Sequence, residues 1–116
     1  MDSYAYSAFL PSFDDAVYEP LEPFTHVDPA GRALQQEREG KDPLAFLSGA
    51  QVTALTPVLG EEIVGLDLTQ LDSNAKDQLS LQTARRGVLV FRDQRAFLSK
   101  DADWLREWEK HFGRRW

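Results

Sequence analysis

The amino-acid sequence predicts a mixed α/β fold. Two short runs in which apolar and polar residues alternate, 52–56 and 62–68, are typical of strands with one buried face. A helix-start signal at residues 72–74 and a run of four large apolar residues, 88–91, follow in that order. From residue 46 to residue 116 the expected order is therefore strand, strand, helix, strand, helix.

Residues 1–45 lack a sustained hydrophobic period and are expected to form an arm that precedes this body. The acidity of the chain lies here, because residues 1–50 hold nine acids and three bases, whereas residues 51–116 hold ten of each. Prolines disfavour helix before them, although residues 32–39 could form a short helix. We expect either an extended arm anchored by aromatic side chains or a disordered segment. The aromatic residues are Tyr4, Tyr6, Phe9, Phe13, Tyr18 and Phe24.

The first two expected strands can pair as a hairpin. Pro57 ends the first strand or places it at an edge, and Gly60 supplies a turn. In the second strand Val64, Leu66 and Leu68 share one face. The pattern thus predicts two antiparallel strands joined across residues 57–61.

Residues 72–86 are predicted to form a helix. Asp72, Ser73 and Asn74 can accept hydrogen bonds from the first turn, and Gly87 is placed to stop the helix. The stripe of apolar positions consists of Ala75, Leu79 and Thr83, flanked by Leu81 and Ala84. The next strand, residues 88–92, is expected to be buried on both faces because its apolar residues are consecutive.

The last helix is expected to begin at Ser99 or Asp101 and to close at Gly113. Its apolar face is rich in aromatic rings, which favours a core face over a ligand-binding box. The members of this face are Trp104, Leu105, Trp108, His111 and Phe112.

Composition excludes several functional classes. The chain has 116 residues, which allows one domain at most, and it has no cysteine, which excludes disulfides and thiolate metal sites. Arg85-Arg86 and Arg114-Arg115 are its two basic pairs, too few for a nucleic-acid partner. No apolar run reaches the roughly 20 residues of a membrane span or forms a secretory signal, so a cytoplasmic protein without membrane contact is expected.

Few residues form a catalytic pattern. The tripeptide His26-Val27-Asp28 matches a metal-binding H-x-D motif by letters, but we expect His26 on the surface of the arm and His111 at a helix end. Glu61 and Glu62 are neighbours that point to opposite faces of a strand, with one of them hydrogen-bonded inward. Arg92-Asp93 is expected to be a structural ion pair rather than part of a site. We assign no catalytic, cofactor-binding or metal-binding residue.

An ordered set of motifs resembles the opening of the taurine/sulfonate dioxygenase (TauD/TfdA-like) family. The first part is TP-x-x-G-x-E-I-x-G-x-x-L, the second is R-G-V, and the third is F-R-D-Q, followed by a helix that ends in F-G. The matching residues are Thr56, Pro57, Gly60, Glu62, Ile63, Gly65 and Leu68, then Arg86, Gly87 and Val88, then Phe91, Arg92, Asp93 and Gln94, and finally Phe112 and Gly113. The proline-rich arm, residues 18–29, is similar to that of the fungal branch.

The resemblance implies a double-stranded β-helix (jelly roll) that uses Fe(II), oxygen and 2-oxoglutarate to hydroxylate a small organic acid. Residues 46–116 would be its N-terminal portion and residues 1–45 an extended arm. The family places its H-x-D motif, its second histidine and its 2-oxoglutarate arginine beyond the F-G pair. We therefore expect a fragment or truncated relative (biological, or the product of a gene-model or splicing error) that is inactive alone and binds neither Fe(II) nor 2-oxoglutarate.

A second hypothesis is a non-catalytic interaction module. Its partner would be a full-length homologue or a second copy of this chain, joined through the exposed apolar strand and the tryptophan face. Because a body this small exposes much apolar surface, we also expect the isolated chain to be poorly stable or sticky.

Overall fold

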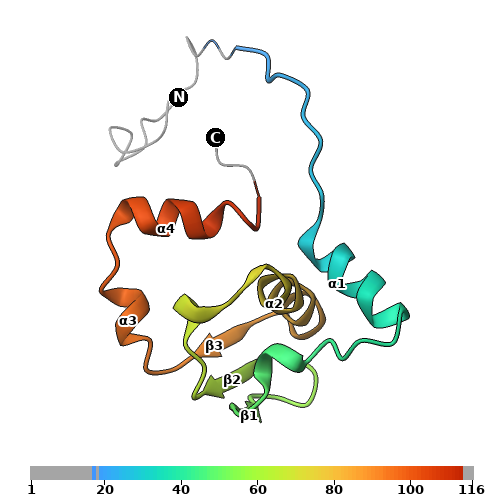
Figure 1. Cartoon of the computed structure of the whole chain (residues 1–116), viewed down its shortest axis with the longest axis vertical. Helices are drawn as coiled ribbons and strands as arrows, with labels where there is room; N and C mark the ends of the chain where they lie inside the picture. Colours follow the sequence, from blue (N-terminus) through green and yellow to red (C-terminus); the bar gives the residue numbers. More distant parts are fainter. Residues whose placement is uncertain (1–16, 18, 114–116) are drawn as a thin grey trace, which may run out of the picture.

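A computed structural model describes residues 17 and 19–113 of the chain. It contains a three-stranded sheet in the order β1-β2-β3, with the strands β1 (Gln51–Ala54), β2 (Glu61–Val64) and β3 (Leu89–Phe91). β1 is antiparallel to β2, and β2 is parallel to β3. The mixed α/β class is confirmed (Figure 1).

The predicted hairpin is confirmed, with strands shorter than expected. Its register pairs Gln51 with Val64 and Ala54 with Glu61. The hydroxyl of Thr56 donates to the carbonyl of Leu59 at 2.7 Å and accepts from the amide of Leu59 at 2.8 Å, which folds the connecting turn. Residues 65–68 leave the strand, and Leu68 begins a short 3₁₀ helix, η3 (Leu68–Gln70).

Helix α2 (Ser73–Arg86) carries the chain from β2 to β3, with the ends that the sequence predicts. The carboxylate of Asp72 accepts from the amide of Ala75 at 2.8 Å. Gly87 ends the helix with a φ of 79°, in a region that side chains disfavour. Because β2 and β3 are parallel, the chain needs such a crossover, and a helix is the usual one.

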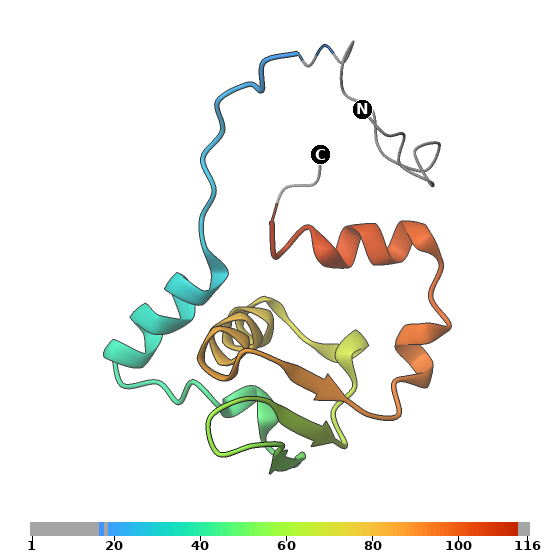
Figure 2. The ribbon, with the colours of Figure 1, turned by 180° about the vertical axis from the view of Figure 1, so that it is seen from behind.

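Helix α1 (Pro29–Arg38) contains most of the short helix considered for residues 32–39, and it corrects the expectation that the arm is extended or disordered over these residues. Asp28 caps it, and Pro29 occupies its first turn, where a proline has no amide to leave unpaired. α1 lies alongside α2 and buries Ala33 there (Figure 2). Residues 19–28 are irregular and exposed, while Tyr4, Tyr6, Phe9, Phe13 and Tyr18 lie outside the described residues. The division into residues 1–45 and residues 46–116 stays a prediction.

Two helices follow β3. A short helix, α3 (Arg95–Leu98), was not expected, and the last helix, α4 (Ala102–Glu109), begins after Asp101, one of its two predicted caps. The carboxylate of Asp101 accepts from the amide of Trp104 at 2.9 Å. α4 lies on the far side of α2 from β1 (Figures 1 and 2).

The core is small, and β3 stands at its margin. Five buried side chains form it, from the short 3₁₀ helix η2 (Ala45–Leu47), β2, η3 and α2. They are Phe46, Leu47, Ile63, Leu68 and Leu79. The expectation that β3 is buried on both faces is wrong, because its three residues are only half-buried and Val88 before it is 49% exposed. Among the described residues β3 is an edge strand, so one of its two edges has no strand beside it.

Candidate functional site

The guanidinium of Arg86 joins the first two family-like motifs into one structural unit. It donates to three main-chain carbonyls of the hairpin turn, those of Thr56 at 3.0 Å, Pro57 at 3.2 Å and Gly60 at 2.9 Å. The amide of Gly60 donates in return to the carbonyl of Arg86 at 2.8 Å. These donors are therefore committed to backbone oxygens and are not available to a substrate.

Glu61 and Glu62 point to opposite faces of β2, as predicted. Glu61 accepts a short hydrogen bond from Gln82 of α2, and its carboxylate lies 3.9 Å from the buried Nε of Arg86. Glu62 pairs with Arg92 across the outer face at 3.2 Å. Arg92 thus forms a structural ion pair, but its partner is Glu62 and not the neighbouring Asp93 that was expected.

The third motif, F-R-D-Q, forms the turn that ends β3. Asp93 has a φ of 58°, a value that aspartate tolerates better than most residues. The side-chain amide of Gln94 donates to the carbonyls of Leu66 at 2.6 Å and Arg92 at 3.0 Å, and its oxygen accepts from the amide of Leu68 at 3.0 Å. Gln94 ties the end of β3 to the segment before α2, so the motif is again used for backbone structure.

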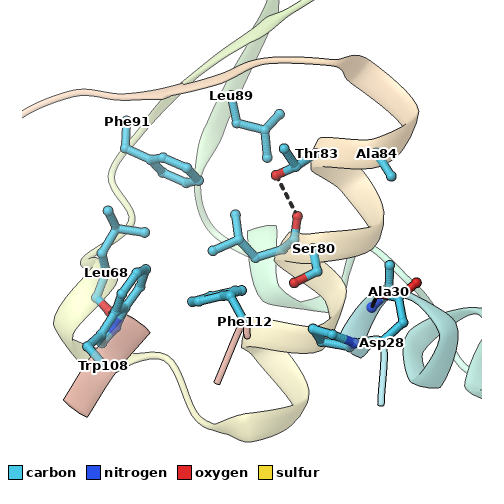
Figure 3. Close-up of a pocket in the computed structure, with 12 residues that line it drawn as sticks. Asp28, Ala30, Leu68, Ser80, Thr83, Ala84, Leu89, Phe91, Trp108 and Phe112 are labelled. Atoms are coloured by element: carbon cyan, nitrogen blue, oxygen red, sulfur yellow. Dashed lines mark hydrogen bonds between the residues drawn. The ribbon is translucent and has the colours of Figure 1, made fainter. Parts of the chain in front are cut away.

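An apolar groove of about 650 Å³ lies between α2, β3, α4 and the start of α1, where Asp28, Pro29 and Ala30 line it (Figure 3). Leu89 and Phe91 of β3 form one wall, α2 forms the second, and Trp108 and Phe112 form the rim. The hydroxyls of Ser80 and Thr83 also line the groove, but both donate to carbonyls of their own helix, at 3.1 and 2.8 Å. The groove therefore offers an apolar surface with few polar groups that could orient a small polar substrate.

Asp77 is the buried carboxylate of the described chain, with a side chain that is 5% exposed. Arg32 of α1 donates to it through two nitrogens, at 2.7 and 3.0 Å. His111, which follows α4, donates to the same carboxylate from Nε2 at 2.7 Å. Asp77 therefore connects three segments, α1, α2 and the end of α4.

The electrostatics of this cluster favour an ionised Asp77. Burial alone would raise the pKa of the Asp77 carboxyl, but the hydrogen bonds from Arg32 and His111 outweigh it and lower that pKa. The hydrogen bond to Asp77 likewise raises the pKa of Arg32. The cluster is thus a satisfied, charged anchor.

The residues of the His26-Val27-Asp28 tripeptide have separate roles. Asp28 caps α1 and accepts from the amide of Ala30 at 3.0 Å. His26 is exposed, as predicted, and His111 is held by Asp77. No three His, Cys, Asp or Glu side chains in residues 17 and 19–113 could hold a metal ion together. The described residues therefore do not fit the iron of the implied family.

Sequence reasoning missed Asp77, although a signal was present. Asp77 precedes Leu81 by four positions and Ala84 by seven, which places it on a helical stripe with a buried leucine. An acid in such a stripe needs a basic partner.

None of the helices in the described part of the chain is long and apolar enough to cross a bilayer.

Comparison with known proteins gives three curated relatives, all of one class. A Saccharomyces cerevisiae alpha-ketoglutarate-dependent sulfonate dioxygenase is 39% identical over 117 residues, which cover 94% of this chain and 26% of the relative. Two Penicillium expansum alpha-ketoglutarate-dependent dioxygenases, cnsP and cnsM, are 38% and 34% identical over 93% of this chain. No protein-family model and no solved structure matches the chain.

All three relatives are alpha-ketoglutarate (2-oxoglutarate)-dependent dioxygenases. Over nearly its whole length the chain is homologous to part of these enzymes, and the resemblance to the sulfonate dioxygenase family is confirmed. The chain spans only 26–29% of the length of the relatives it matches.

Proposed function

We propose that this chain is the N-terminal scaffold of an Fe(II)- and 2-oxoglutarate-dependent dioxygenase that oxidises a sulfonate or a similar small organic acid. In this proposal the complete protein has a jelly-roll fold, and its metal and cosubstrate ligands come from sequence that the chain does not contain. The observation that carries the proposal is the 34–39% identity to dioxygenases over 93–94% of the chain.

The use of the motif residues supports a scaffold role. The side chains of Arg86 and Gln94 donate hydrogen bonds to main-chain carbonyls, and Glu62 forms an ion pair with Arg92. A non-haem Fe(II) site needs two histidines and one carboxylate on one face of the metal. Asp77 has Arg32 and a single histidine as partners, which is the arrangement of a structural anchor.

An activity assay tests the inactivity of the isolated chain. Purified chain is incubated with Fe(II), 2-oxoglutarate, oxygen and taurine, and succinate is measured. We expect no succinate above the background without protein. Turnover by the chain alone would overturn the assignment of the metal ligands to other sequence.

A chimera tests the assignment to a dioxygenase. The chain replaces the matched region of the S. cerevisiae sulfonate dioxygenase, and the whole protein is assayed for succinate formation that depends on a sulfonate. We expect activity, because the two regions are 39% identical. A folded but inactive chimera, beside an active parent, would count against the proposal.

A second candidate function is an interaction module that joins a full-length homologue or a second copy. The free edge of β3 favours it, because an unpaired strand edge can accept another strand. The chain is mixed with the intact yeast relative, and the products are separated by size. A complex of fixed stoichiometry supports the module, whereas two separate peaks at micromolar concentration exclude it.

A further inference from the structure

The groove between α2, β3 and α4 has the features of a surface that another apolar segment covers. Leu89 and Phe91 are half-buried on its β3 wall, and its volume is about 650 Å³. The groove is open to solvent, and a large exposed apolar surface on a folded unit marks an interaction site. The hydroxyls of Ser80 and Thr83 are satisfied within α2, so an apolar occupant would leave neither of them unpaired.

The position of α4 sets the width of this groove. α4 itself buries none of its residues fully. Near its start, the ring of Phe97 meets those of Trp104 and Trp108 edge to face, at 5.8 and 5.2 Å. Beyond its end, His111 is held by Asp77 at 2.7 Å. α4 is therefore fixed at both ends, while Trp108 of this helix and Phe112 beyond its end line the groove (Figure 3).

Trp108 shows that the rim is held in place rather than collapsed. Its indole N–H donates to the carbonyl of Leu68 at 3.2 Å, and the ammonium of Lys76 lies 5.3 Å from its ring. Phe112 packs against Trp108 with ring centroids 5.0 Å apart. These contacts hold both rings at the mouth of the groove and leave the space beneath them open.

The length of the relatives indicates what the occupant is. The chain covers 26–29% of them, so about three quarters of such a protein lies outside the described structure. The β3 wall of the groove also carries the unpaired edge of the sheet, so the groove and the edge form one continuous surface.

We propose that this groove is the docking site for an apolar segment of the same dioxygenase, supplied by the region that the chain does not cover. In this proposal the hydrogen bonds of Asp77 to His111 and Arg32 hold the end of α4 against α2, so that the groove stays open for this segment. The inference rests on the proposed function, because the occupant belongs to the complete enzyme.

A photo-cross-linking experiment on the chimera with the yeast enzyme tests the proposal. Phe91 in the groove is replaced by p-benzoylphenylalanine, and the cross-linked peptides are identified by mass spectrometry. Leu98, which is 80% exposed and outside the groove, receives the same group as a control. We expect the Phe91 probe to link within one molecule to an apolar peptide of the yeast-derived region, and the Leu98 probe to give far less of that product.

The outcomes separate the two proposals. An active chimera whose Phe91 probe links only to residues 17–113, or only to a second molecule, would overturn the docking site and leave the proposed function standing. His111→Ala in the same chimera should lower the yield of the Phe91 product several-fold, whereas Lys110→Ala beside it should not. If both variants give the same yield of the Phe91 product, the hydrogen bond between His111 and Asp77 does not keep the groove open for the segment.

The isolated chain gives a measurement that does not depend on the chimera. The groove should bind the apolar dye 8-anilinonaphthalene-1-sulfonate, and Ala84→Trp, which fills the groove, should reduce the dye fluorescence several-fold. Leu98→Trp is the control outside the groove. If wild type and both variants bind equally while their circular dichroism is unchanged, the groove is not an accessible apolar surface and the proposal fails.

Discussion

The guanidinium of Arg86 lies 3.0 Å from the carbonyl oxygen of Thr56, although 30 residues separate them in sequence. Thr56 opens the first family-like motif and Arg86 opens the second. One side chain therefore connects two stretches that look independent in the sequence. The connection holds the hairpin turn against the end of α2 and sets where β3 begins beside β2.

Replacing Arg86 with methionine should destabilise the fold by about 2 kcal/mol, since hydrogen bonds from a charged donor contribute about 1.5–3 kcal/mol. The variant keeps an apolar stem but leaves the carbonyls of Thr56, Pro57 and Gly60 without this donor. Urea unfolding followed by circular dichroism measures the loss. Arg85→Met is the matched control, because Arg85 pairs at the surface with Glu37 and should lose less. Equal losses would refute the special role of Arg86.

Gly87→Ala should also destabilise the chain, by about 2 kcal/mol, because a positive φ disfavours any side chain. Gly87 has a φ of 79°, and an added Cβ would lie 2.5 Å from a methyl group of Leu59. Gly40→Ala is the control, since its φ is 91° but nothing lies within 4 Å of the added atom. In a Leu59→Ala background the two glycine substitutions should cost nearly the same. If the excess cost of Gly87→Ala persists there, the contact with Leu59 is not its cause.

The elements that the sequence predicted have local signals. The helix from Ser73 to Arg86 has its cap at Asp72 and its stop at Gly87, within one turn of each end. The hairpin is marked by its alternation and by the turn residues between its strands. Such signals act between residues a few positions apart, so they can be read without knowing the rest of the fold.

The features that sequence reasoning missed depend on distant partners. Prolines are expected to disfavour helix in the arm, whereas Pro29 follows the cap Asp28 and opens α1, which packs on α2. The burial of β3 depends on which strands lie beside it. The four apolar residues 88–91 do not by themselves indicate those neighbours. Asp77 is buried because Arg32 and His111, 45 and 34 residues away, neutralise it. The helical stripe marks Asp77 as a candidate for burial, but no local pattern identifies which distant residues pair with it.

The Asp77 cluster should make stability depend on acid pH. Burial opposes the shift, but Arg32 and His111 lower the pKa of Asp77 in the folded state. A lowered pKa means that the carboxylate contributes stability above the ordinary aspartate pKa, and that this contribution is lost as the pH falls through the folded-state value. The free energy of unfolding should therefore fall below about pH 4, the usual range of an aspartate.

Asp77→Asn isolates this contribution. The variant should lose about 2 kcal/mol at pH 7, because one buried acceptor of charge-assisted hydrogen bonds is replaced by an amide. Its unfolding free energy should then change less between pH 5 and pH 3 than that of the wild type. Chemical unfolding at each pH gives both quantities, and Asp103→Asn, at an exposed position of α4, is the control. A variant with the same pH profile as the wild type would exclude Asp77 as the titrating group.

Fe(II) should not stabilise the isolated chain. A ligand raises the unfolding free energy in proportion to the logarithm of its concentration over its dissociation constant, so even a moderate site would shift the midpoint. The described residues hold no group of three metal-ligating side chains, and the Nε2 atom of His111 is hydrogen-bonded to Asp77. Thermal unfolding under anaerobic conditions, with and without Fe(II) and 2-oxoglutarate, should therefore give the same midpoint. The intact yeast relative, an alpha-ketoglutarate-dependent dioxygenase, is the positive control and should be stabilised by 2-oxoglutarate. A shift for the isolated chain that disappears in His26→Ala or His111→Ala would instead place a metal site on this chain.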